Sequence, residues 1–196
     1  MNSSPVQLEM VWPPDRQTPD ADTITPAGYR LRLGDPGDRE ALFALMERAG
    51  WPSGDRRRLE LSLPRVVPGS WHVAECTDDG LLVASALGLD DPTPWHPAGA
   101  ELGWVAADPD HRGRGLGLAV CAAVTARLIE VGCRDVHLYT DEWRLAAVKT
   151  YLRLGYLPLI FAPEILPRWR TVCEALAWPY TPAAWPTAAE ASQWIP

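Results

Sequence analysis

A regular alternation of strand-like and helix-like patterns between residues 29 and 161 is the strongest constraint on the fold of this chain. Strand-like stretches alternate apolar and polar residues, whereas helix-like stretches repeat apolar residues at intervals of three and four. Strands are predicted at 29–33, 71–76, 81–89, 100–106, 135–140 and 156–161. Helices are predicted at 38–49, 55–63, 115–131 and 144–154. This order predicts a three-layer α/β domain, in which helices flank a central mixed β-sheet.

The prolines divide the chain into a core and two ends. Residues 1–28 and 178–196 hold nine of the 20 prolines. Because proline interrupts helices and removes a backbone donor from a sheet, both ends are predicted to be extended or disordered tails. The domain is therefore expected at 29–177, where the formal charge is −3 of the −7 of the whole chain. Residues 162–177 have helical spacing and predict a last helix, with a strand as the alternative.

Composition excludes several classes of partner. A net charge of −7 disfavours nucleic acid, because phosphate neutralisation supplies most of the sequence-independent affinity. No apolar run approaches the roughly 20 residues of a membrane span, and no secretory signal is recognisable, so a cytoplasmic protein without a membrane partner is expected. The cysteines are far apart within apolar patterns and predict reduced core thiols, with neither disulfides nor a bound metal. They are Cys76, Cys121, Cys133 and Cys173.

A glycine-rich loop at residues 112–117 lies between a predicted strand and the predicted helix 115–131. A helix N-terminus presents unpaired N–H groups and a partial positive charge, and glycines let an anion approach that backbone. Arg112 and Arg114 add charge, so the loop predicts a phosphate-binding site. The alternative is that the glycines only permit a tight turn. Neither a Walker sequence nor GxGxxG spacing is present.

The loop Arg112-Gly113-Arg114-Gly115-Leu116-Gly117 resembles the Q/R-x-x-G-x-G/A signature of the GNAT N-acetyltransferase superfamily. The strand at 101–105 and the segment from Arg144 through Tyr151 to Tyr156 also look like that family's motifs, in the same order. The resemblance covers about residues 29–161. It implies a GNAT-like fold with strands splayed at the acyl-CoA site, and direct transfer of acetyl from acetyl-CoA to a primary amine.

Two departures from the family pattern limit what the resemblance implies. The family often has Asn where this chain has Arg144. The family usually ends in a strand that closes the sheet, whereas residues 162–177 have a helical pattern here. Because this change falls where the acceptor would bind, the acceptor cannot be taken from a relative.

The resemblance also implies roles for individual residues. Glu101 is the expected general base, directly or through water, with His72 and His96 as alternatives; its other interpretation is a strand carboxylate paired with an arginine. By the alternation of residues around them, His111 and His137 are expected at the surface. Tyr151 is the expected general acid, or alternatively a core residue. The expected cofactor-binding residues are Val105, Ala107, Arg112, Gly113, Arg114, Gly115, Leu116, Gly117, Arg144 and Ala147.

The acceptor is expected to be a small-molecule amine or the amine of a protein or peptide. Tryptophans near the cleft could enclose a cationic amine, but core packing is the more common role. These are Trp51, Trp71, Trp95, Trp104 and Trp143. An alternative function is a non-catalytic acyl-CoA-binding module that serves regulation or interaction. A nucleotide-phosphate enzyme using the same loop is a third, disfavoured by the missing metal carboxylates and Walker lysine.

Overall fold

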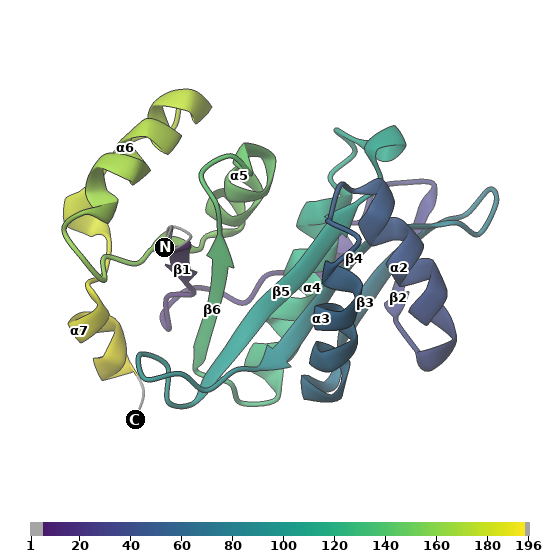
Figure 1. Ribbon diagram of the computed structural model, residues 1–196, viewed down its shortest axis with the longest axis horizontal. Helices are drawn as coiled ribbons and strands as arrows, with labels where there is room; N and C mark the ends of the chain where they lie inside the picture. Colours follow the sequence, from purple (N-terminus) through teal and green to yellow (C-terminus); the bar gives the residue numbers. More distant parts are fainter. Residues whose placement is uncertain (1–5, 195–196) are drawn as a thin grey trace.

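A seven-stranded mixed sheet forms the centre of the computed structural model, which describes residues 6–194 (Figure 1). The spatial strand order is β2-β3-β4-β5-β6-β1-β7. Only β5 and β6 run parallel, and every other neighbouring pair is antiparallel. The strands are β1 (Leu8–Val11), β2 (Tyr29–Leu33), β3 (Val66–Cys76), β4 (Leu82–Asp90), β5 (Gly99–Ala107), β6 (Asp135–Thr140) and β7 (Leu157–Pro158).

Helices cover both faces of the sheet, which confirms the predicted α/β architecture. Apolar residues of α2 and α3 pack on one face, and those of α4, α5 and α6 belong to the larger core on the other. The helices are α1 (Ala21–Ile24), α2 (Arg39–Arg48), α3 (Asp55–Ser62), α4 (Leu116–Glu130), α5 (Leu145–Leu154), α6 (Ile165–Leu176) and α7 (Ala188–Ala191). Short 3-10 turns occupy Pro36–Asp38, Leu63–Arg65, Pro109–His111, Pro182–Ala184 and Ser192–Trp194.

The N-terminal segment differs from the predicted tail, because residues 8–11 form a strand inside the sheet. This strand, β1, pairs antiparallel with β6 on one side and β7 on the other. Leu8 and Met10 are completely buried. Pro13 and Pro14 follow the strand rather than interrupt it, so the density of prolines did not predict the structure of residues 8–11. The predicted strand 156–161 shrinks to β7, and β1 supplies the sheet partner of β6.

The C-terminal segment also packs on the domain instead of forming an extended tail. The α6 helix confirms the helical prediction for 162–177 and buries Trp169. Beyond it, Trp185 lies 6.0 Å from Trp169 between ring centroids, and Thr187 forms a parallel bridge with Ile160. The fold therefore extends past the predicted boundary at residue 177.

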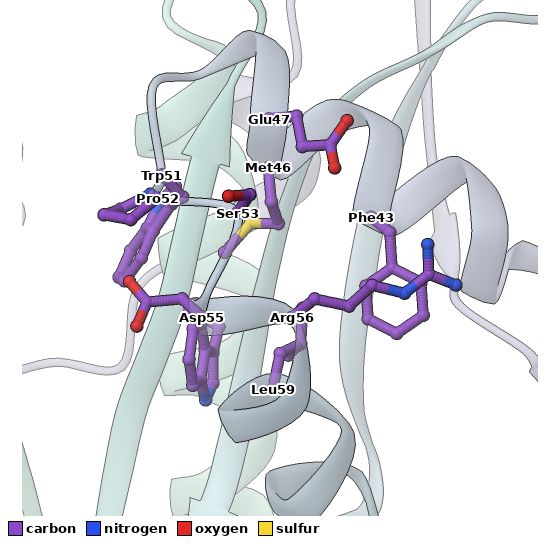
Figure 2. A pocket seen from close by; sticks show the side chains of 10 residues that line it. Phe43, Met46, Glu47, Trp51, Pro52, Ser53, Asp55, Arg56 and Leu59 are labelled. Atoms are coloured by element: carbon purple, nitrogen blue, oxygen red, sulfur yellow. The ribbon is translucent and has the colours of Figure 1, made fainter.

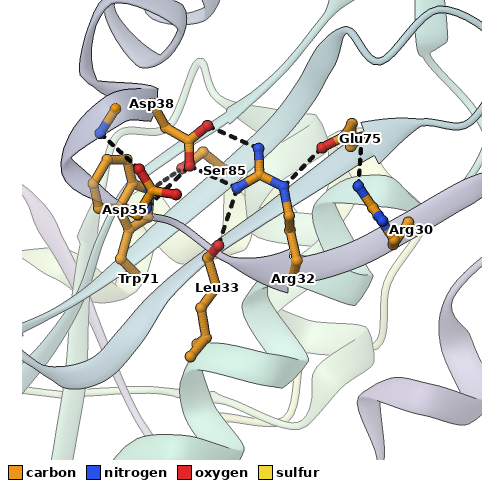
Figure 3. A network of polar contacts seen from close by, with 9 residues as sticks. Arg30, Arg32, Leu33, Asp35, Asp38, Trp71, Glu75 and Ser85 are labelled. Carbon is orange, nitrogen blue, oxygen red and sulfur yellow. Dashed lines mark hydrogen bonds and ion pairs between the residues drawn. The ribbon is translucent and has the colours of Figure 1, made fainter.

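An ion-pair network fastens the edge strand β2 to its neighbours (Figure 3). Arg32 donates to both carboxylate oxygens of Asp38, at 2.6 and 2.8 Å, and to Glu75 at 2.7 Å. Arg30 donates to the other oxygen of Glu75 at 2.8 Å. Because a bidentate arginine-carboxylate pair restricts geometry as well as charge, the network fixes β2 against β3 and the start of α2.

Two further expectations concern the cysteines and the membrane. Among the described residues all four cysteines are free thiols; three are buried and Cys133 is half-buried. Within residues 6–194, no helix has the length and apolar character that crossing a bilayer requires.

Candidate active site

The parallel strands β5 and β6 separate along their length and open a cleft. They pair only through residues 99–101 and 135–137, and then diverge (Figure 1). The pairing of β5 with β4 also shifts register opposite this point, between Ser85 and Leu87. Trp104 takes a positive φ of 50°, which is unusual for a side chain of this size. The strained residue and the shift mark a bulge that bends β5 away from β6.

A cleft beside the end of β5 has a volume of about 670 Å³ and is strongly cationic. Its walls come from the end of β5, the loop and first turn of α4, the start and outer face of α5, and the loop after α2. None of the described residues that line it is a carboxylate. Its lining cations are Arg112, Arg114, Arg144, Lys149 and Arg153. In a protein of net charge −7, this concentration of positive charge favours an anionic ligand.

The glycine-rich loop leads directly into the N-terminus of α4. Gly113 and Gly115 have φ values of 76° and 84°, which favour glycine because a side chain would be strained there. In the described chain no side chain caps α4, and Leu116 and Gly117 line the cleft. The free N–H groups of the first turn are therefore available to an anion.

Contacts from distant segments hold this loop in place. The buried Asp108 carboxylate accepts a hydrogen bond from the Asp110 N–H and another, at 2.6 Å, from Arg48 at the end of α2. The Tyr29 hydroxyl, on β2, contacts both His111 Nδ1, at 2.8 Å, and the Arg114 guanidinium. Sequence analysis missed Tyr29 and Arg48, since neither lies near the motif in the chain. His111, expected at the surface, is half-buried and lines the cleft.

Glu101 lies on β5 just where the two parallel strands begin to separate. Its carboxylate leans towards Gly103, where a Cβ atom would stand 2.8 Å from Oε1. It is not among the residues that line the cleft. Burial, with repulsion from Asp91, raises the pKa of Glu101 to about 7 against the opposing charges of Arg65 and Arg58. A carboxyl group with this pKa can accept and release a proton near neutral pH.

Tyr151 lies on α5 and reaches the cleft from the opposite wall. The residue is 5% exposed and lines the cleft together with Ala147, one turn earlier. Its hydroxyl has no hydrogen-bond partner among the described residues. Burial raises the pKa of the phenol well above its ordinary value, so Tyr151 is protonated at neutral pH. A buried, protonated hydroxyl at a cleft wall is available to donate to a ligand.

The two alternative bases do not line the cleft. His72 is on β3, where burial and the nearby Arg127 charge lower its pKa. His96 is 1% exposed, with Nδ1 2.5 Å from Asp135 and Nε2 in contact with Glu9. Burial opposes the charged form, but the two carboxylates outweigh it and raise the pKa of His96 to about 9. His96 is therefore an imidazolium held between carboxylates at neutral pH.

His137 corrects a prediction, since it is completely buried rather than at the surface. Its ring stacks on that of His96 at 4.1 Å and 12°, and Nε2 lies 3.2 Å from Asp91. The alternation along β6 places His137 on the face of the strand that points away from the main core. The loop between β4 and β5, which carries His96, covers this face. His96, Asp135 and His137 offer metal-ligand atoms within 4.8 Å of one another. Because the imidazole planes are nearly parallel, their in-plane lone pairs do not converge on one point in this arrangement.

Arg144 lies between two tryptophans at the mouth of the cleft. Its guanidinium carbon is 4.2 Å from the Trp51 ring centroid and 4.5 Å from that of Trp143. It also forms an ion pair with Asp141 at 3.3 Å. Arg144 thus lines the cleft, although it stands where the family often has Asn. The contact joins the loop after α2 to the start of α5 across the opening.

Trp51 also borders a second, much smaller pocket of about 10 Å³ (Figure 2). Phe43, Met46 and Leu59 are among the residues that line it, and the Trp104 ring packs against Trp51 at an angle of 37°, with centroids 5.0 Å apart. Of the other tryptophans expected near the cleft, Trp71 is buried in the core and Trp95 is exposed and does not line the cleft. Two of the five, Trp51 and Trp143, therefore line the cleft, and Trp104 lines the smaller pocket.

Solved structures define the class to which this fold and cleft belong. A GCN5-related N-acetyltransferase from Sphaerobacter thermophilus is 27% identical, with a TM-score of 0.61 over 79% of this chain and 49% of that one. The ribosomal-protein-S18-alanine N-acetyltransferase from Escherichia coli, at 22% identity, shares the fold, with a TM-score of 0.52 over 65% of this chain and 76% of that one. The architecture is that of GCN5-related N-acetyltransferases.

The sequence itself matches the family described as "Acetyltransferase (GNAT) family" over residues 40–156, which include the loop before α4, Glu101 and Tyr151. The chain belongs to the GNAT acetyltransferase family, as its motifs predicted.

Two curated relatives carry the name mycothiol acetyltransferase. The protein from Thermobispora bispora is 36% identical over 148 residues, 67% of this chain and 47% of the relative. That from Actinosynnema mirum is 33% identical over 144 residues, 67% of this chain and 45% of the relative. The chain thus spans about half the length of these relatives.

Proposed function

We propose that this protein transfers an acetyl group directly from acetyl-CoA to a primary amine. The observation that carries the proposal is the cationic cleft between the end of β5 and α5, which has no carboxylate among its described lining residues and contains the uncapped N-terminus of α4. Such a helix start, with Arg112 and Arg114 beside it, suits the pyrophosphate of CoA. Family membership supports the same cofactor.

In the proposed mechanism, Glu101 takes a proton from the acceptor ammonium, directly or through water. The free amine attacks the thioester carbonyl, whose acetyl and pantetheine portions the backbone of Val105 and Ala107 would orient. The new N–C bond forms, the nitrogen releases its second proton to solvent, and the C–S bond breaks while Tyr151 donates its proton to the departing sulfur. Solvent then reprotonates Tyr151 and deprotonates Glu101. Positioning and proton transfer supply most of the rate enhancement in this scheme.

The names of the relatives make an amine related to mycothiol the first acceptor to test, and the helix at residues 165–176, where the family usually has a strand, is the reason to test other amines beside it. A screen that follows thiol release from acetyl-CoA would test such amines beside polyamines, amino acids and peptide N-termini. Transfer to at least one amine supports an enzyme. Binding of acetyl-CoA with no transfer to any of them would favour a non-catalytic acyl-CoA-binding module.

Gly117→Glu tests the phosphate-binding loop. A Cβ at Gly117 would meet nothing within 4 Å, so the substitution adds a carboxylate to the cleft without a clash. We expect calorimetry to show at least about a tenfold loss of acetyl-CoA affinity, or about 1.4 kcal/mol, from charge repulsion. Gly117→Ala is the matched control and should bind normally. Equal affinity of Gly117→Glu and the wild type would contradict the loop assignment.

Tyr151→Phe tests the general acid. We expect kcat to fall by about two orders of magnitude with little change in acetyl-CoA affinity, because only proton donation is removed. Tyr156→Phe is the matched control: Tyr156 is equally buried, but its hydroxyl hydrogen-bonds to Thr125 at 2.8 Å, away from the cleft. If Tyr151→Phe retained wild-type kcat on an accepted amine, Tyr151 would not be the acid.

A further inference from the structure

The cations of this protein divide into those paired with carboxylates and those without such a pair, and half of the unpaired ones line the cleft. Ten of the 17 arginines form ion pairs with carboxylates. Among the described residues, the cations without such a pair are Arg16, Arg57, Arg112, Arg114, Arg134, Lys149, Arg153 and Arg170. Four of these eight line the cleft. In a chain with 25 acidic residues, this segregation leaves the cleft charges free for a ligand.

The four unpaired cleft cations lie on two different walls. Arg112 and Arg114 belong to the loop before α4, whereas Lys149 and Arg153 lie one turn apart on α5. Both α5 side chains are exposed, while Tyr151 between them is buried. The helix therefore separates two environments: an inner one around the Tyr151 hydroxyl and an outer, charged one. Lys149 is also the single lysine of the chain.

The spacing of Lys149 and Arg153 is unfavourable without a ligand. Like charges at i and i+4 destabilise a helix, and none of the described residues that line the cleft offers a carboxylate to offset them. An anion bound between the two side chains would remove this repulsion. A phosphomonoester suits the position, because at neutral pH it carries about 1.5 to 2 negative charges on three acceptor oxygens.

CoA carries two separate phosphate groups, a pyrophosphate and a 3′-phosphomonoester. The N-terminus of α4 with Arg112 and Arg114 accounts for one of them on the loop wall. We infer that Lys149 and Arg153 bind the other, the 3′-phosphate, and so make this protein selective for CoA esters over their 3′-dephospho analogues. This inference rests on the proposed function and adds the second phosphate site.

The test compares CoA with dephospho-CoA, which differ by that phosphate alone. Calorimetry would use the full chain as wild type and as the double variant Lys149→Ala/Arg153→Ala. Alanine preserves the helix. The control Arg57→Ala/Arg134→Ala removes the same charge at two exposed, unpaired arginines outside the cleft. We expect the wild type and the control to bind CoA about tenfold or more tightly than dephospho-CoA, equivalent to about 1.4 kcal/mol.

The double variant should lose most of that preference while its affinity for dephospho-CoA stays within about twofold of the wild-type value, taking twofold as well under the 1.4 kcal/mol of a tenfold change. Equal binding of the two ligands by the wild type would overturn the inference but not the proposed function. An equal loss for both ligands in the double variant would also overturn it, because the cations would then act on a shared part of the molecule. Failure of the wild type to bind either ligand would overturn both proposals.

Discussion

At the scale of single residues, the raised pKa of Glu101 predicts how kcat/KM depends on pH. A base must be ionised to act, and burial raises the pKa of Glu101 to about 7. We therefore expect kcat/KM to rise with pH through about 7 and then level off. Glu101→Gln should lose this limb together with about two to three orders of magnitude in kcat/KM, measured between pH 5.5 and 9. His72→Gln should keep both the rising limb and the wild-type value of kcat/KM. An unchanged limb in Glu101→Gln would show that another group titrates.

Single residues also show how far sequence reasoning can reach. Glu101, Tyr151 and the 112–117 loop were predicted from short, local motifs, and the structure brings the loop and Tyr151 to one cleft. Tyr29 could not be identified, because its contacts with the loop depend on strand pairing across more than 80 residues. The burial of His137 was missed because alternation gives the face of a residue, and not what covers that face.

At the scale of elements, the burial of β1 predicts that this strand contributes to stability. Leu8 is completely buried in the main core, so Leu8→Ala should remove apolar contact and leave a cavity. We expect a loss of about 2–5 kcal/mol in the free energy of unfolding. Thermal denaturation should show Tm lower by at least about 5 °C. Val6→Ala, at a position 69% exposed, is the control and should have little effect. A wild-type Tm for Leu8→Ala would show that β1 is dispensable.

A second element-scale prediction concerns the Glu9–His96–Asp135 contact, which joins β1, the β4–β5 loop and β6. Folding raises the pKa of His96 from 6.5 to about 9, so its stabilising effect is full below pH 6.5 and is lost as pH rises through 9. We expect the Tm difference between wild type and His96→Gln to be largest near pH 6 and to shrink by pH 10. A difference that does not vary with pH would contradict a charged His96.

Elements with a long, regular pattern were predicted to within a few residues, as α4 and α5 illustrate. The terminal segments were not. Four residues of β1 carry too little periodicity to outweigh the prolines around them, and their place in the sheet depends on β6 and β7. Tertiary contacts decide such short elements, and a single sequence contains no direct record of those contacts.

At the scale of the whole molecule, the net charge is negative, but the charge in the cleft is positive. A chain of −7 repels anions at long range, whereas its cleft attracts them at short range. We expect the association rate of CoA to respond to salt because of the local field, and to fall by at least about threefold between 0.05 and 0.5 M NaCl. Stopped-flow fluorescence of the cleft tryptophans would measure it. A rate that rises with salt would mean that the net charge dominates.

The position of β1 in the sheet also constrains the order in which the strands can pair while the chain is being made. Leu8 pairs with Thr140 and Met10 with Pro158, so this strand leaves the ribosome far ahead of both its neighbours. Until about residue 140 has been made, the strand has neither of its neighbours, and the second of them, β7, follows only at about residue 158. Closure across so long a stretch of chain is entropically costly and slow. Although β1 is made before the other strands, it can therefore join the sheet only late in folding.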